Sequence, residues 1–412
     1  MSRWMSLVLL LALGLAGGPA LFSQEEPGEP VTAEASAEDP AVESEAEPTE
    51  KTATAETEKP RGFRWRVGGS FGVSNGWLTA ESKHRRGVMP DEGVVGEFAL
   101  TASVKTPLKG LRAKARVCWG CHTVELEDAF FEYRADSRLR VRAGRFSLPF
   151  GHINERHDQN VRRTVSKPLP YIMGNMVRQR EFNLGVLPAP TVDNGIAAGG
   201  KFSLFSGGQL SYDAFAVAGL KGFGPDLNFI TSRQFRDLNG EPALGGRVGF
   251  SVVGSGVSWN FSGSYMWGNY DPGGRRNYQV AALASTLDIG PFSLKWEAVA
   301  RQTEYANPDN GEDNSFLKYG YWIQADLEVA RGVYIVAALD GLFVTDLYLG
   351  PNGPGLTQGS NTTDDHNRIT RIVGGVGYSP WGGILLKAAA EYWEFSDFQD
   401  SWVIQGSIGW AF

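Results

Sequence analysis

The chain has 412 residues, with 52 glycines, 12% aromatic residues and a formal net charge of −7 at pH 7. Beyond the amino terminus it has no run of about 18 apolar residues, which argues against transmembrane helices. A chain of this length forms one large β domain or two ordinary domains. The glycine and aromatic content fits a large β domain with many turns.

The amino terminus has the features of a secretory signal peptide. Arg3 precedes an apolar run from Met5 to Ala16 and then small residues, so we predict a signal peptide over residues 1–23. Residues 24–60 contain 12 acidic residues and two lysines. This Glu/Ala/Pro-rich segment has almost nothing to bury, and we predict an acidic disordered linker.

From residue 61 onward, apolar and polar residues alternate with a period of two. In 316–329 the apolar residues Leu317, Tyr319 and Ile323 alternate with Lys318, Gln324 and Asp326. The chain ends in the same way, with an apolar face from Trp402 to the terminal Phe412. An apolar face toward lipid and a polar face toward water are typical of strands in an outer-membrane β-barrel.

Sixteen such strands are predicted, an even number as expected for a bacterial single-chain barrel. They are placed at 64–74, 94–106, 111–117, 124–135, 139–149, 194–205, 208–220, 243–253, 256–268, 276–289, 292–305, 316–329, 332–346, 368–379, 383–397 and 401–412. Long loops at 75–93, 150–193, 221–242 and 347–367 alternate with tight turns. The predicted fold is therefore all-β, a 16-stranded antiparallel transmembrane β-barrel of porin type over residues 61–412 in the bacterial outer membrane. A soluble β-sandwich or solenoid is the alternative.

Residues 126–151, LEDAFFEYRADSRLRVRAGRFSLPFG, resemble a strand pair of the phosphate-selective porin family of bacterial outer membranes. The resemblance covers two strands closely and the remainder loosely. It implies a sixteen-stranded pore whose long third loop, here 150–193, folds into the lumen. It does not indicate which solute passes.

Basic residues recur with a period of two in the first part of the barrel. Residues 61–180 hold 22 Lys or Arg against 11 Asp or Glu, whereas residues 181–412 hold 14 against 23. Arginines on barrel strands face water, because at mid-depth on the lipid side each costs about 2–4 kcal/mol. A cationic wall favours anions, and Asp326, Glu328, Glu297 and Asp340 are expected on an opposite, acidic wall. The predicted pore-lining residues are Arg112, Lys114, Arg116, Arg138, Arg140, Arg142 and Arg145.

Residues 118–122, Cys-Trp-Gly-Cys-His, match the C-x-x-C-H signature of covalent c-type haem attachment. Cys118 and Cys121 would bind one haem c, and His122 would be the proximal iron ligand. Cysteines three apart in a strand point to opposite faces, so we expect the motif to form a turn between the third and fourth strands, at the outer side. Cytochrome–porin fusions combine these parts, with the motif placed differently.

Two other interpretations of this motif remain open. A Cys118–Cys121 disulfide is common in oxidising compartments, and a metal site would use both thiolates and His122 but lacks a fourth ligand nearby. If haem is present, His152 or His157 is expected as the distal ligand. The other candidates are His84, Met89, Met173, Met176 and His366.

The sequence thus predicts a porin-like channel that carries one haem c for electron transfer at the cell envelope, with a periplasmic cytochrome as partner. The alternative is a passive channel that favours small anions, with a disulfide and no haem. A third class is a structural or adhesion barrel with a sealed pore. No enzyme motif and no nucleic-acid-binding pattern occurs, and a homotrimer is expected because porins commonly form trimers.

Overall fold

A computed structural model describes residues 62–78, 93–120, 124–172, 185–223, 226–306, 311–345, 366–395 and 400–412. The predicted signal peptide and the acidic linker lie outside these ranges. Within them, no helix combines the length and the hydropathy of a membrane span.

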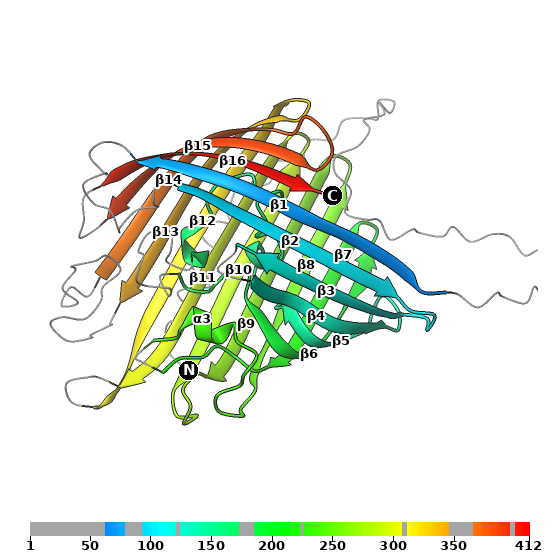
Figure 1. The fold of residues 1–412 in the computed structure, drawn as a ribbon, viewed down its shortest axis with the longest axis vertical. Helices are drawn as coiled ribbons and strands as arrows, with labels where there is room; N and C mark the ends of the chain where they lie inside the picture. Colours follow the sequence, from blue (N-terminus) through cyan, green and yellow to red (C-terminus); the bar gives the residue numbers. More distant parts are fainter. Residues whose placement is uncertain are drawn as a thin grey trace, which may run out of the picture. The chain divides into compact units, whose positions relative to one another are not determined.

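Sixteen antiparallel strands form one closed barrel (Figure 1), which confirms the predicted fold. They are β1 (Arg64–Leu78), β2 (Gly93–Lys105), β3 (Leu111–Trp119), β4 (Val124–Arg134), β5 (Arg140–Ser147), β6 (Val192–Phe205), β7 (Gly208–Val217), β8 (Ala243–Gly254), β9 (Val257–Asn269), β10 (Asn277–Ile289), β11 (Phe292–Ala306), β12 (Asp313–Ala330), β13 (Val333–Thr345), β14 (His366–Tyr378), β15 (Ile384–Phe395) and β16 (Ser401–Ala411). Short helices occur in the loops: η1 (Ile153–Glu155), η2 (Leu169–Tyr171) and α3 (Phe229–Ser232).

The barrel closes between its first and last strands. Phe412 and Gly69 exchange backbone hydrogen bonds of 2.9 and 3.0 Å, and β1 pairs with β16 from Ser70–Ala411 to Leu78–Val403. In Figure 1 the blue β1 runs beside the red β16. Because every strand has two neighbours, no lipid-facing edge is left with unpaired backbone groups.

The alternation of the sequence places apolar side chains outside and polar ones inside. On β12, Ile323 and Leu327 are exposed, whereas Lys318, Gln324 and Asp326 are buried. On β16, Trp402, Ile404 and Ile408 point outward and Gln405 is buried inside. A row of aromatic rings in tilted and T-shaped contact follows this outer surface, as in an interfacial girdle: Phe205, Phe250, Trp259, Phe261 and Trp296.

Replacing Ile372, an outward residue in the middle of β14 that is 55% exposed, should test this sidedness. We expect Ile372→Arg to destabilise the folded barrel in lipid by about 2–4 kcal/mol, because arginine then faces hydrocarbon. Reversible urea unfolding in liposomes measures the change. A cost below about 0.5 kcal/mol, the usual range for water-exposed surface positions, would contradict the assignment of this face to lipid.

The lumen contains a packed apolar cluster in addition to charged groups. It joins the connection between β5 and β6 (residues 148–191, here called loop 3) and the connection between β7 and β8 (218–242, loop 4) to the inner wall. Phe150, Leu169 and Tyr171 of loop 3 and Phe229 of loop 4 are at most 1% exposed. The prediction that the long third loop folds into the lumen is therefore confirmed for its described residues, and these loops narrow the interior.

A β-bulge interrupts the alternation in β4. Arg116 pairs with Asp128 and Val117 with Leu126, so Glu127 is the extra residue. A bulge of this kind re-aims side chains, and Glu127 and Asp128 are both buried on the lumen side. The bulge therefore places two consecutive carboxylates beneath the basic residues of β3.

Candidate solute path and the Cys118 site

Loop 3 follows the inner wall around much of the barrel. The backbone N–H groups of His152 and Ile153 donate to Glu297 on β11 at 3.1 and 3.3 Å. Farther along, Ser166 donates to Gln405 on β16. Three more hydrogen bonds join loop 3 to the wall: Arg371 on β14 donates to Lys167 O, Leu169 N donates to Asp340 on β13, and Arg301 on β11 donates to Val186 O. These contacts place loop 3 against β11, β13, β14 and β16. The partly exposed charged side chains of β3–β8 mark the part of the lumen that the loop leaves accessible.

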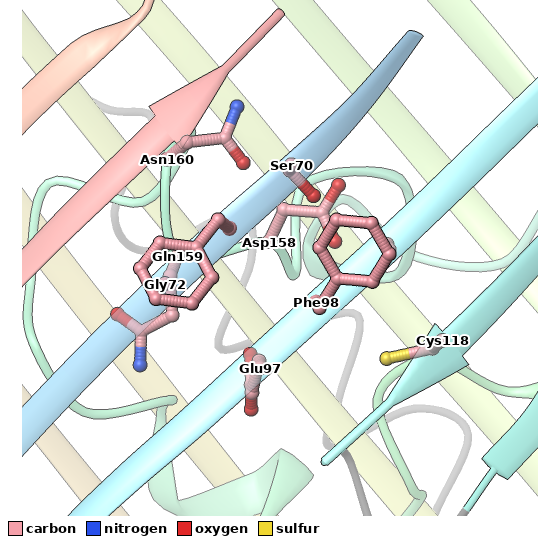
Figure 2. Close-up of a pocket in the computed structure, with 10 residues that line it drawn as sticks. Ser70, Gly72, Glu97, Phe98, Cys118, Asp158, Gln159 and Asn160 are labelled. Atoms are coloured by element: carbon pink, nitrogen blue, oxygen red, sulfur yellow. The ribbon is translucent and has the colours of Figure 1, made fainter. Parts of the chain in front are cut away.

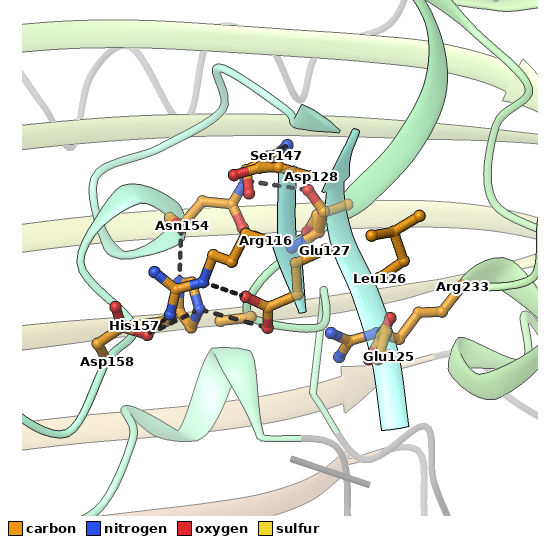
Figure 3. Close-up of polar contacts among 12 residues, drawn as sticks. Arg116, Glu125, Leu126, Glu127, Asp128, Ser147, Asn154, His157, Asp158 and Arg233 are labelled. Carbon is orange, nitrogen blue, oxygen red and sulfur yellow. Dashed lines mark hydrogen bonds and ion pairs between the residues drawn. The ribbon is translucent and has the colours of Figure 1, made fainter. Parts of the chain in front are cut away.

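A buried charge cluster attaches loop 3 to β3 and β4 (Figure 3). Arg116 Nε donates to Glu127 at 2.7 Å and its Nη2 donates to Asp158 at 2.5 Å. His157 Nε2 lies 3.2 Å from Asp158 Oδ1 and 3.7 Å from Glu127 Oε1, and His157 Nδ1 lies 3.0 Å from Asn154 O. Arg116 is thus committed to holding the loop and is largely withdrawn from solvent.

The periplasmic half of the β3–β8 wall presents cations to the lumen. We call Arg112, Lys114, Arg140, Arg142 and Arg247 the basic wall. Their carboxylate partners are Glu132, Asp128 and Asp213, at distances of 2.5–3.4 Å. The cations are 17–44% exposed, whereas the three carboxylates are 0–7% exposed. Arg134, 45% exposed and 3.6 Å from Glu132, adds a sixth cation at the strand end. A solute therefore meets six positive groups lying over three buried carboxylates, which gives the lumen an excess of positive potential.

The structure divides the seven predicted pore-lining residues into three groups. Arg112, Lys114, Arg140 and Arg142 belong to the basic wall. Arg116 and Arg145 are buried supports: Arg145 donates to the carbonyl oxygens of Leu126 and Arg233 at 2.6 and 2.5 Å. Arg138 was placed wrongly, because β5 begins only at Arg140 and Arg138 is exposed in the turn before it.

Arg247 was not among the predicted pore-lining residues, although the sequence carries a signal for it. It is the single charged residue in the glycine-rich strand β8 (ALGGRVGFSVVG), at the same parity as the lumenal Ala243. Its Nη2 lies 3.4 Å from Asp213 and its Nη1 donates to Gly151 O at 3.2 Å. The preceding Gly245 and Gly246 carry no side chains that could shield it.

The predicted acidic wall exists, but it does not face open lumen. Glu297 and Asp340 accept loop 3 backbone N–H groups, and Asp326 pairs with Lys295 at 2.7 Å. Glu328 is exposed at the turn, where it accepts from Gly332 N at 2.8 Å. The carboxylates at positions 297 and 340 therefore hold the loop, and Asp326 neutralises a cation.

Cys118 lies on the lumen side at the outer end of β3, opposite Ala99 of β2. Its side chain is 1% exposed, and the sulfur is disulfide-bonded; the chain contains one other cysteine, Cys121. The prediction that Cys118 sits in a turn is wrong, because ladder pairing extends β3 through Trp119. Gly120, with φ of +90°, makes the bend there, and Cys121 and His122 lie outside the described residues.

The space around Cys118 is small (Figure 2). Ser70, Gly72, Phe98 and the loop 3 residues Asp158–Asn160 line a cavity of about 10 Å³, roughly the space of one water molecule. Among the described residues, Cys118 is thus closely packed on its lumen side.

The two preferred distal ligands lie on different walls. His157 belongs to the cluster on β3 and β4, whereas His152 Nε2 lies 3.5 Å from Thr286 Oγ1 on β10. Burial and the nearby Arg156 lower the pKa of His152 to about 3, so its imidazole is neutral. His366 begins β14, and His84, Met89, Met173 and Met176 fall in ranges that the structure does not describe. Among the residues it does describe, no group of three His, Cys, Asp or Glu side chains is arranged to hold a metal ion.

A closed sixteen-stranded barrel with an apolar outer band and an inward-folded third loop belongs to the class of porin-like outer-membrane β-barrels. This class agrees with the predicted location in the bacterial outer membrane. No protein-family model matches the chain, and no curated protein sequence matches it. The phosphate-selective family therefore stays a prediction.

Solved structures with this architecture come from several bacteria. OmpT of Vibrio cholerae is 7% identical and aligns over 86% of this chain and 99% of its own, with a TM-score of 0.52. An anion-selective porin from Comamonas acidovorans is 12% identical over 85% and 100% of the two chains, with a TM-score of 0.51. The outer-membrane channel DcaP of Acinetobacter baumannii is 10% identical over 85% and 98%, also with a TM-score of 0.51. At these identities the likeness establishes the fold alone.

Proposed function

We propose that this protein is a passive outer-membrane diffusion channel that favours small anionic solutes. The observation that carries the proposal is the basic wall, in which cations lie over buried carboxylates along the part of the lumen that loop 3 leaves uncovered. Fixed charge along a narrow path lowers the barrier to counter-ions and raises it to co-ions. The fold shared with solved outer-membrane porins supports the channel part of the proposal.

Liposome swelling tests the channel directly. Vesicles containing the folded protein should swell in isosmotic solutions of small sugars and small carboxylates, and faster with the anionic solutes. Protein-free vesicles and vesicles with heat-unfolded protein are the controls. If the vesicles do not swell in any solute, the apolar cluster in the lumen seals the barrel, and the third class, a structural barrel, replaces the channel.

The setting of Cys118 supports the disulfide alternative over electron transfer, and a haem c at Cys118 and Cys121 remains a prediction from the motif. If the disulfide is right, the intact mass of protein matured in a haem-c-competent host should equal the polypeptide mass less two hydrogens. A gel stained for haem peroxidase activity should show no band. A mass increased by one haem would reverse this proposal and restore the electron-transfer function with its periplasmic cytochrome. A homotrimer is part of the proposal, to be checked by the mass of the native complex in detergent.

A further inference from the structure

One buried lysine on the inner wall is enclosed by loop 3. Lys387 on β15 is 5% exposed. Four oxygens lie within hydrogen-bond distance of its Nζ, whose three N–H groups they share: Gln159 O at 2.7 Å, Gln159 Oε1 at 3.2 Å, Arg162 O at 3.0 Å and Thr164 O at 3.1 Å. All four acceptors are neutral oxygens of a single stretch of loop 3. A buried ammonium is tolerated only when hydrogen bonds replace its hydration, so this stretch must curl around the charge.

The wall beside Lys387 is shaped to receive the same stretch. Gly72 on β1 and Gly409 on β16 are direct partners across the closing strand pair. A Cβ at Gly72 would lie 2.6 Å from Gln159 Cβ, and a Cβ at Gly409 would lie 2.8 Å from Asn160 Cα. Any side chain at either position would push the loop away from the wall.

The contacts of this stretch reach both sides of the closing pair. Asp158 is bound by Arg116 on β3, and Ser166 donates to Gln405 on β16 at 2.9 Å. Residues 158–166 therefore connect the first strands of the barrel to the last two across the β1–β16 junction.

We infer that Lys387 is the positioning residue of the constriction. Its ammonium fixes residues 159–164 in the glycine notch formed by Gly72 and Gly409, and this sets how far loop 3 extends into the lumen. The inference rests on the proposed channel for its effect on permeation, but the seating of the loop can be measured independently.

Limited trypsin digestion of the folded barrel in detergent, with cleavage sites identified by mass spectrometry, measures the seating. In the native protein the bonds after Arg162 and Arg163 should be protected. In Lys387→Ala they should be cleaved roughly tenfold faster or more, because several charge-assisted hydrogen bonds are lost and cleavage follows the open population. Added n-propylammonium, which replaces the atoms removed from the side chain, should restore protection. In bilayers the same variant should show larger and noisier conductance, and the amine should reverse both changes.

Two variants keep the inference open to refutation. Gly409→Ala should expose the same bonds to trypsin without any change of charge, and n-propylammonium should not restore their protection. This variant also tests the glycine notch if Lys387→Ala does not fold. Lys295→Ala removes a lumenal charge that pairs with Asp326 and should leave both bonds protected. The inference would be overturned if the bonds after Arg162 and Arg163 stayed protected from trypsin in Lys387→Ala. It would also be overturned if n-propylammonium restored protection equally in Lys387→Ala and Gly409→Ala. If the native barrel does not conduct, the proposed channel is refuted, but the digestion still tests whether Lys387 seats loop 3.

Discussion

Replacing Arg112, Arg142 and Arg247 together by glutamine should remove the preference for anions. With Arg134 included, six cations over three carboxylates become three over three, so the excess positive charge disappears. Two unit charges 4 Å apart in water interact by about 1 kcal/mol, so three such losses should change the anion-to-cation permeability ratio by roughly tenfold or more at low salt. The reversal potential across a bilayer under a salt gradient measures the ratio.

A matched control removes the same total charge from the periplasmic turns. Lys109, Arg138 and Arg331 are exposed in the turns before β3, β5 and β13, and the triple glutamine variant should keep the native reversal potential at 0.15 M salt and above, where screening is strong. If the control shifts the potential as much as the wall variant, net charge and not the basic wall sets the selectivity. If neither variant shifts it, the solute path lies elsewhere.

Replacing Arg371 by leucine should destabilise the barrel more than any surface change. Arg371 is 2% exposed and donates to Asp340 at 3.0 Å, to Glu391 at 3.3 Å and to Lys167 O of loop 3 at 2.9 Å. Its loss leaves two buried carboxylates without their cation, for which we expect about 3–5 kcal/mol. Unfolding by urea in lipid vesicles, followed by tryptophan fluorescence, gives the free energy.

Two further variants separate charge from packing. Adding Asp340→Asn and Glu391→Gln to Arg371→Leu removes the unpaired charges and should recover more than half of the loss. Arg368 lies on β14 three residues before Arg371 and pairs with Glu394 on β15. Its side chain and that of Glu394 are 50% and 44% exposed, so Arg368→Leu should cost about 0–1 kcal/mol. Equal costs at positions 368 and 371 would show that Arg371 is not an essential buried support.

The sequence allowed all sixteen strands to be predicted, because a period of two survives wherever one face meets lipid and the other meets water. The strand ends moved by a few residues. β1 continues to Leu78 and β12 begins at Asp313, since backbone pairing above the membrane needs no apolar residue to continue.

The arrangement inside the barrel was less predictable. Parity alone would place Glu127 on the opposite face from Asp128, and only the bulge in β4 turns both inward. Parity also could not tell Arg112, which stays partly exposed, from Arg116, which loop 3 covers, because the distinction depends on Asp158, 42 residues away in sequence. The position of Cys118 depended on strand pairing that continues beyond the last alternating residue.

The burial of the carboxylates beneath the cations is what gives the lumen its expected preference for anions. A lumen with equally exposed Arg and Glu side chains would have no sign preference, whereas Glu132 at 0% exposure under Arg112 at 44% leaves the guanidinium to meet the solute. The measurement that tests this most directly is the zero-current potential of single native channels separating concentrated from dilute potassium chloride. We expect a potential whose sign reports faster passage of chloride than of potassium and whose size grows as the salt is diluted. A potential of the opposite sign, or no conductance through the folded barrel, would contradict it.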